Sequence, residues 1–178
     1  MAIEPDTKDW TWVLERACEC GFDPAAADPD GLPVAIATTS RGWRQRLQQA
    51  DARRRPSSAT WSALEYGAHV RDMARVMTGR LALILDQDDP IFPDWDQDEA
   101  AVAANYREQD PAVVADELEL AIAELAGGYA HVQPQAWDRR GRRSNGAHFT
   151  AYTLGLYALH DLQHHRRDVA ILDAADGS

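Results

Sequence analysis

The chain has 178 residues, which is enough for one domain with a sizeable core and hardly enough for two. Its 18 Lys and Arg residues are outnumbered by 29 Asp and Glu residues, and the net charge of −11 argues against binding to nucleic acid or to an anionic membrane. No apolar run approaches the roughly 18 residues of a membrane-spanning helix. The start of the chain has neither the basic nor the apolar region of a secretory signal, so we expect a cytoplasmic protein.

The first 31 residues are predicted to form an N-terminal extension with one short helix. Apolar residues lie on one side of the segment from Asp9 to Glu19, which is the pattern of an amphipathic helix. Cys18 and Cys20 stand at its end, before a connector rich in Gly, Pro and Asp. A zinc site would need partner ligands at suitable spacing, and the neighbouring sequence offers none. We therefore interpret the two cysteines as small apolar residues at a helix end.

Residues 32–178 are predicted to form the main domain, an all-α four-helix bundle. Apolar residues recur at helical spacing in four long segments, which run from Leu32 to about Asp51, from Thr60 to Leu85, from Ala112 to Ala130 and from Ala151 to about Asp173. An acidic loop over residues 87–99 and a short helix over residues 99–108 separate the second segment from the third. The dipeptide Asn145-Gly146 favours a tight turn, so a small hairpin or irregular segment is expected before the last helix, with Thr150 as its N-cap.

Histidines on two of these helices are candidate metal ligands. His160 and His164 are separated by about 40° around the helix axis, so both imidazoles can face one point, whereas His165 is one step further round and is expected to point away. His69 lies within the apolar stripe of the second long segment. Three imidazoles would bind Zn²⁺ and leave a fourth position open, as in catalytic sites. A histidine on a helix face is more often a satisfied core residue, so spacing alone leaves both interpretations open.

Four stretches extend this interpretation by resemblance. The sequences WSALEYGAHVRD at residues 61–72 and HDLQHH at residues 160–165 resemble the DinB superfamily of bacterial four-helix proteins, also called DinB/YfiT-like metalloenzymes. The sequences FPDWDQD at residues 92–98 and GRRSNG at residues 141–146 resemble an actinobacterial branch related to mycothiol-dependent enzymes. In that superfamily one histidine on the second helix and an HxxxH pair on the fourth bind a divalent metal. The resemblance assigns these roles to His69, His160 and His164, with Zn²⁺ favoured and Ni²⁺ or Fe²⁺ as the alternatives.

The resemblance also implies a function. Some relatives use the metal to activate a low-molecular-weight thiol such as bacillithiol or mycothiol, so we expect a metal-dependent thiol S-transferase that acts on a small-molecule substrate. A metal-dependent hydrolase is the first alternative, and a metal-stabilised bundle that binds a ligand without catalysis is the second. A homodimer is a possible assembly, because helical bundles bury spare apolar faces in this way.

Carboxylates near the three histidines are candidates for orienting them. A histidine that binds a metal usually donates its other ring N–H to a carboxylate or a carbonyl group. Glu65 lies four residues before His69, Asp72 lies three residues after it, and Asp168 lies four residues after His164. The alternative for each carboxylate is a solvent-exposed charge on the helix surface that has no role toward the histidines.

Substrate contacts are expected from one tyrosine and from a group of arginines. Tyr157 lies one turn before His160, where it would either position a substrate or pack in the core. Arg142 and Arg143 belong to a cluster of four arginines before the last helix, and a guanidinium group suits the binding of a carboxylate. A solvated loop is the alternative for this cluster.

Overall fold

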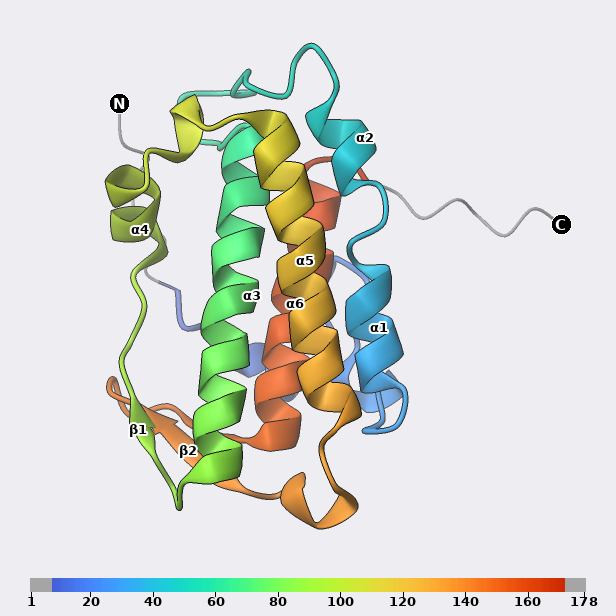
Figure 1. Cartoon of the computed structure of the whole chain (residues 1–178), viewed down its shortest axis with the longest axis vertical. Coiled ribbons are helices and arrows are strands. Elements are labelled where there is room, and N and C mark those ends of the chain that lie inside the picture. The colour runs from blue at the N-terminus through green and yellow to red at the C-terminus, as the bar shows by residue number, and fades with distance from the viewer. Residues whose placement is uncertain (1–7, 172–178) are drawn as a thin grey trace, which may run out of the picture.

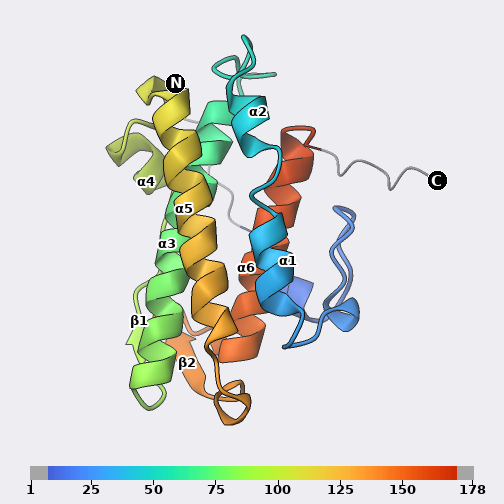
Figure 2. The same ribbon diagram turned by 45° about the vertical axis from the view of Figure 1, so that its right-hand side comes forward.

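The computed structural model describes residues 8–171. Four helical rods run side by side and enclose the core, and the rod made of α1 and α2 consists of two short helices end to end (Figures 1 and 2). Helix α3 packs against α5 and α6, and α1 packs against both α5 and α6. The helices of the bundle are α1 (Leu32–Thr38), α2 (Trp43–Leu47), α3 (Ala63–Asp86), α5 (Pro111–Ala130) and α6 (Ala151–Asp168). The predicted bundle of helices is therefore confirmed.

Shorter elements decorate the bundle. Residues 8–31, which we call the N-terminal segment, pack against α6 through the 3₁₀ helix η1. The remaining elements are η1 (Trp10–Leu14), η2 (Pro24–Ala26), β1 (Ile91–Phe92), α4 (Gln97–Ala103), η3 (Tyr106–Glu108), η4 (Pro134–Ala136), β2 (Arg140–Arg143) and β3 (His148–Thr150). None of the described helices is both long and apolar enough to cross a membrane.

The small sheet corrects the expectation of a purely α-helical fold. Strands β2 and β3 form the predicted hairpin, with Gly141 opposite Phe149. Strand β1 joins β2 in parallel, with Ile91 opposite Arg142, although its residues were predicted to lie in a loop. Strand β1 has two residues, which are too few for a periodic pattern in the sequence. The buried side chain of Phe92 holds this short strand against the bundle.

Local signals set where the long helices begin. The side chain of Thr150 accepts a hydrogen bond from the Thr153 backbone N–H at 3.1 Å, so its predicted role as the N-cap of α6 is confirmed. Helix α3 starts after Ser62, slightly later than predicted, because Ser62 and Glu65 form a capping box. These caps fix the start of the two helices that carry the histidines.

Three predicted helices differ from the observed ones. The first long segment breaks between α1 and α2, because Gly42 has a φ of +85° and a Cβ there would lie 2.6 Å from the Ile171 side chain. The N-terminal helix is reduced to the 3₁₀ helix η1, and the helix over residues 99–108 is divided into α4 and η3. The predicted end of the last helix, Asp173, lies outside the described residues, and α6 ends at Asp168.

Candidate metal centre

Helix α6 presents two neighbouring stripes of ligand side chains. His160 and His164 form one stripe, and Asp161 and His165 form the next, since residues four apart share a face and consecutive residues are about 100° apart. The structure gathers each stripe into a separate cluster of groups whose ligand atoms all lie within 4.8 Å of one another. Asp161 and His165 meet His69 from α3, whereas His160 and His164 meet Cys18 and Cys20. We call these the His69 cluster and the Cys18 cluster.

The His69 cluster contains ligand atoms that approach each other without being satisfied. Asp161 Oδ1 lies 3.4 Å from His69 Nε2 and 3.2 Å from His165 Nε2, yet neither contact has hydrogen-bond geometry. The His69 side chain is completely buried, and both of its ring nitrogens lack a hydrogen-bond partner. An unsatisfied buried polar group costs about 1–3 kcal/mol. A cation between these atoms would remove that cost.

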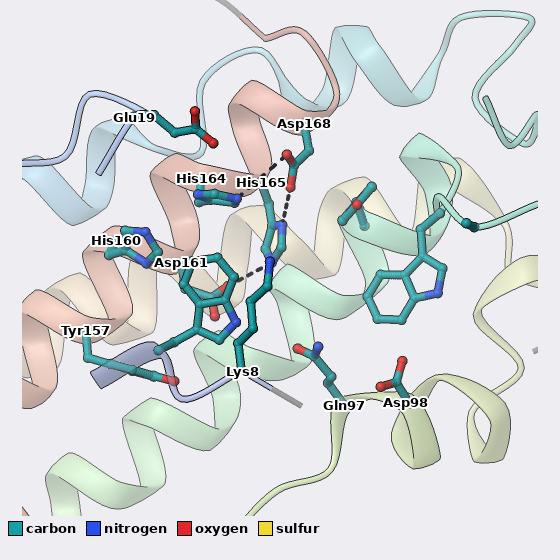
Figure 3. A pocket seen from close by; sticks show the side chains of 14 residues that line it. Lys8, Glu19, Gln97, Asp98, Tyr157, His160, Asp161, His164, His165 and Asp168 are labelled. Atoms are coloured by element: carbon teal, nitrogen blue, oxygen red, sulfur yellow. Dashed lines mark hydrogen bonds and ion pairs between the residues drawn. The ribbon is translucent and has the colours of Figure 1, made fainter. Parts of the chain in front are cut away.

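A second carboxylate orients His165. The Nδ1–H group of His165 donates a hydrogen bond to Asp168 Oδ2 at 2.8 Å, which leaves Nε2 as the nitrogen that faces Asp161 and His69. Figure 3 shows Asp168 reaching His165 on this side, with Asp161 on the other. This arrangement of carboxylate, imidazole and ligand position is the one that metal-binding histidines commonly have.

The charges of the cluster are strongly perturbed. Burial alone would lower the pKa of His165, but the carboxylates of Asp161 and Asp168 outweigh it and raise that pKa to about 9. Burial lowers the pKa of His69, which favours the neutral imidazole that a metal requires. Burial would raise the pKa of Asp161, but His165 and His69 outweigh it and hold that pKa far below its usual value. The ionised carboxylate of Asp161 can therefore balance one positive charge in the cluster. When no metal is bound, the protonated ring of His165 carries that charge.

Aromatic rings shield the buried end of the cluster. The His69 ring stacks on Trp95 with centroids 5.5 Å apart, and Trp61 approaches it at 5.4 Å. Trp95 belongs to the connection between β1 and α4, and Trp61 precedes α3. Because both rings exclude water, electrostatic interactions inside the cluster are stronger than they would be at the surface.

A cavity of about 380 Å³ opens on the exposed side of the cluster. Side chains from the N-terminal segment, α3, α4 and α6 surround it, and Figure 3 shows them converging on the histidines. Its walls include Lys8, Trp10, Glu19, Trp61, Tyr66, Gln97, Asp98, Tyr157, His160, Asp161, His164, His165 and Asp168. Its size falls within the range of about 300–1,000 Å³ that is usual for small-molecule sites.

The structure divides the three predicted metal ligands. His160 and His164 lie together, as expected, but His69 lies in the other cluster. His165 belongs to a different cluster from His160 and His164, as its position one step further round the helix predicted, but its ring contacts His69, with the two ring centroids 4.8 Å apart. Sequence reasoning missed Asp161 as a partner of His69. The signal was the Asp161–His165 spacing, which repeats the spacing of His160 and His164 one residue later.

The predicted carboxylates have different partners. Glu65 accepts hydrogen bonds from Arg55 and from Ser62, and therefore serves the start of α3. Asp72 accepts hydrogen bonds from Arg71 and from the Tyr106 hydroxyl group. Of these three carboxylates, Asp168 is the one that accepts a hydrogen bond from a histidine of the two clusters, namely His165.

The residues predicted to contact the substrate differ in whether they line the cavity. Tyr157 lines the cavity, and burial raises the pKa of its hydroxyl group, so it remains a hydrogen-bond donor at neutral pH. Arg143 lies over the Tyr157 ring at 5.9 Å and pairs with Asp94 at 3.4 Å. Arg142 pairs with Asp89 at 3.1 Å, away from the cavity walls.

The donor set of the His69 cluster fits a divalent metal. Two imidazoles and one carboxylate are the protein ligands of several catalytic zinc sites, which keep a further position open. Nickel and iron also accept imidazole and carboxylate groups. The structural observation in favour of such an ion is that His69 Nε2 and Asp161 Oδ1, 3.4 Å apart, are both buried without a hydrogen-bond partner.

The fold and the His69 cluster define a helical-bundle protein with metal-ligand side chains gathered between its second and last long helices. The model of the DinB superfamily matches residues 38–169, and the chain belongs to that superfamily, as the sequence resemblance implied. Its structure is similar to that of YfiT from Bacillus subtilis, with a TM-score of 0.70 and 14% sequence identity over 88% of this chain and 90% of that chain. YfiT is described as a probable metal-dependent hydrolase with an unusual four-helix bundle topology. The likeness shows a common fold, and no curated protein matches this chain.

Proposed function

We propose that this chain is a metal-dependent enzyme in which His69, Asp161 and His165 hold one divalent cation beside the cavity. The observation that carries the proposal is that His69 Nε2 and Asp161 Oδ1, both buried and without a hydrogen-bond partner, converge with a ring nitrogen of His165. Zn²⁺ is the favoured ion for this donor set, and Ni²⁺ or Fe²⁺ are the alternatives. Two of the three residues, Asp161 and His165, line the cavity, so a bound molecule can reach the centre.

The reaction we favour is transfer of a small thiol to an electrophile, with a thiol of the mycothiol type. A divalent metal held by these residues would supply Lewis acidity, which would lower the pKa of a bound thiol so that it loses its proton to solvent. A thiol transferase therefore needs no separate general base. The carboxylates of Glu65 and Asp72, which lie one turn on either side of His69, are engaged with Arg55 and with Arg71.

The walls of the cavity suit a polar thiol. Gln97, Asp98 and the protonated Tyr157 hydroxyl group can exchange hydrogen bonds with hydroxyl and amide groups. Trp10 and Trp61 supply flat apolar surfaces against which the electrophile can pack. The chain's own residues thus bind and orient the two reactants, while Trp61 and Trp95 keep water from the buried side of His69.

Metal-dependent hydrolysis is the second candidate, and Asp98 is the residue that favours it. Its carboxylate lies on the cavity wall opposite helix α6, where a general base for an attacking water would have to be. The description of YfiT as a probable metal-dependent hydrolase supports the same candidate. A third candidate is a metal-stabilised bundle that binds a small ligand without turnover.

An activity comparison separates these candidates. The zinc-loaded protein is assayed with mycothiol and a chlorinated electrophile, and in parallel with a panel of esters. Thiol transfer forms a C–S bond, breaks the C–Cl bond and releases chloride and a proton, so chloride release and loss of free thiol must be equal. We expect both in the wild type and neither in Asp161→Asn, while Asp138→Asn, at an exposed position, serves as the matched control.

Each result of that assay selects one candidate. Ester cleavage that depends on Asp161 and on Asp98, without thiol transfer, would establish the hydrolase. Bound metal without turnover of either substrate class, together with loss of the fold on metal removal, would establish the structural bundle. Absence of stoichiometric metal from the wild type would remove the basis of all three.

A further inference from the structure

The Cys18 cluster lies on the other stripe of α6, and the proposed enzyme does not use it. Its members come from two distant parts of the chain, since Cys18 and His164 are 146 residues apart in sequence. One ligand atom from each of Cys18, Cys20, His160 and His164 lies within 4.8 Å of the other three. Both cysteines are free thiols. Two thiols and two imidazoles around one point are the ligand set of structural zinc sites.

We propose that Cys18, Cys20, His160 and His164 bind a second divalent cation, zinc, in a closed four-ligand site that fastens the N-terminal segment to helix α6. This site is separate from the His69 cluster and does not depend on the proposed enzymatic function.

The distances within the Cys18 cluster fit a tetrahedral ion. Zn–S bonds of about 2.3 Å and Zn–N bonds of about 2.0–2.1 Å give an S to N edge of about 3.6 Å in a tetrahedron. Cys18 Sγ lies 3.6 Å from His164 Nδ1. The largest separation between the four ligand atoms, up to 4.8 Å, exceeds that edge by little more than 1 Å. Small rotations of side chains are enough to close the site.

A buried and unsatisfied imidazole is the second, independent sign of a ligand. His160 is 5% exposed, and its Nε2 atom is buried without a hydrogen-bond partner. The rings of Trp10, Trp12 and Phe22 surround it, with centroids 5.6, 6.4 and 5.4 Å away. A thiol–imidazole hydrogen bond between Cys18 and His164 would account for two members of the cluster, but it would leave Cys20 and His160 unexplained.

The backbone around the cysteines forms a tight turn. Gly21 has a φ of +97°, which turns the chain directly after Cys20. The turn is closed by hydrogen bonds from Gly21 N–H to Cys18 O at 3.0 Å and from Cys18 N–H to Phe22 O at 2.8 Å. This turn places both sulfur atoms within reach of His160 and His164.

The surroundings also argue against a reactive cysteine. Burial raises the pKa of the Cys20 thiol to about 11, which is the opposite of what a nucleophilic or redox-active cysteine needs. Cys20 is therefore not prepared to act as a nucleophile, and the case for coordination rests on the distances between the four groups and on the unsatisfied ring of His160.

Asp168 connects the two clusters. Its Oδ1 atom lies 3.9 Å from His164 Nε2, while its Oδ2 atom accepts the hydrogen bond from His165. The nitrogen of His164 that faces Cys18 is Nδ1, so the carboxylate stands on the far side of the ring, where it can orient the ligand. Lys8, Trp10 and Glu19 of the N-terminal segment line the cavity, so the proposed clamp would also fix one of its walls.

Cobalt substitution tests the proposal on the 178-residue chain, purified under reducing conditions and reconstituted with Co²⁺ alone. We expect two cobalt ions per chain and a thiolate-to-cobalt charge-transfer band in the near ultraviolet. The band should vanish in Cys20→Ser with loss of one ion, and it should persist in His69→Ala, which should also lose one ion. His131→Ala, at an exposed position on the C-terminal end of α5, is the matched control and should keep both ions and the band.

The outcomes distinguish this proposal from the proposed function. If one cobalt ion binds and the band is absent, the Cys18 cluster is not a metal site, and the proposal for the His69 cluster is unaffected. If one cobalt ion binds and the band is present, the Cys18 cluster binds metal and the His69 cluster does not. A reagent that modifies thiols gives a second measurement that needs no variant. It should release one zinc equivalent per chain from the zinc-loaded wild type, and modification of both thiols without zinc release would overturn the proposal.

Discussion

The two stripes of helix α6 carry the same spacing of ligand residues but face different surroundings. Asp161 and His165 face another helix of the bundle and the cavity, where three protein ligands leave room for a bound molecule. His160 and His164 face the N-terminal segment, where two cysteines complete a set of four and aromatic rings cover His160. The same spacing on α6 therefore gives an open site where the pair faces α3 and a closed site where it faces the N-terminal segment. The segment packed against the helix determines the kind of site.

Replacing Asp161 breaks the open site and should have the largest effect. Asp161→Asn keeps the shape of the side chain but removes the charge that balances a cation. We expect loss of one metal equivalent and a fall in turnover of more than about 100-fold, since even outer partners of metal ligands contribute about 10–100-fold. Metal analysis and the transfer assay measure both effects. Activity close to that of the Asp138→Asn control would show that Asp161 is not a ligand.

Removing the cysteines should break the closed site. In the double variant Cys18→Ser, Cys20→Ser, the link between two distant parts of the chain is lost, and a cross-link of this span stabilises by up to about 5 kcal/mol through loop closure. The N-terminal segment should detach more readily, so trypsin should cleave after the exposed Arg16 faster than in the wild type. Equal cleavage rates and equal unfolding free energies in the two proteins would show that no such link exists.

Asp168 tests the connection between the sites. In Asp168→Asn the Nδ1–H group of His165 loses its charged acceptor, and the contact with His164 is weakened. We expect metal affinity at the His69 cluster to fall by about 10–100-fold, with a smaller loss at the Cys18 cluster because that contact is 3.9 Å long. Competition with a chelator measures the two affinities. An unchanged affinity at the His69 cluster would argue against an orienting role.

Glu65 should have the smallest effect on either site, because it is buried at the start of α3 and bonded to Arg55 and Ser62. Burial alone would raise the pKa of Glu65, but these partners outweigh it and lower that pKa. The ionised group therefore stabilises the fold above the unfolded pKa of about 4.3, and this stability is lost as the pH falls through the lower folded value. Glu65→Gln should reduce the unfolding free energy at pH 7 by about 1–3 kcal/mol and flatten its dependence on acid.

Denaturant unfolding at a series of pH values measures this change. Glu99→Gln is the matched control, since Glu99 lies in the first turn of α4 but is exposed. Both variants should keep the metal content of the wild type. A loss of metal from Glu65→Gln alone would restore Glu65 as a partner of His69, as the sequence spacing suggested.

Elements that depend on local signals could be predicted from the sequence. The apolar periodicity predicted α3, α5 and α6, Thr150 predicted the start of α6, and Asn145-Gly146 predicted the hairpin. The break at Gly42 could not be foreseen, because a glycine is tolerated in a helical pattern. What requires it is the approach of Ile171 from the other end of the chain.

The ligand clusters show where prediction from spacing stops. Two overlapping pairs on α6 have the same four-residue spacing, and the choice between them depends on a rotation of about 100° around the helix axis. Packing against α3 and the N-terminal segment sets that rotation, and no local signal in the sequence reports it. The cysteines lacked partners nearby in the sequence because their partners, His160 and His164, lie at the other end of the chain.

Anomalous scattering at the zinc edge from crystals of the zinc-loaded protein tests the central claim most directly. Two separate ions are expected, one held by His69, Asp161 and His165 with an open position toward the cavity, and one held by two sulfurs and two imidazoles. A single ion held jointly by His69, His160 and His164 would contradict the assignment of the two stripes to different sites.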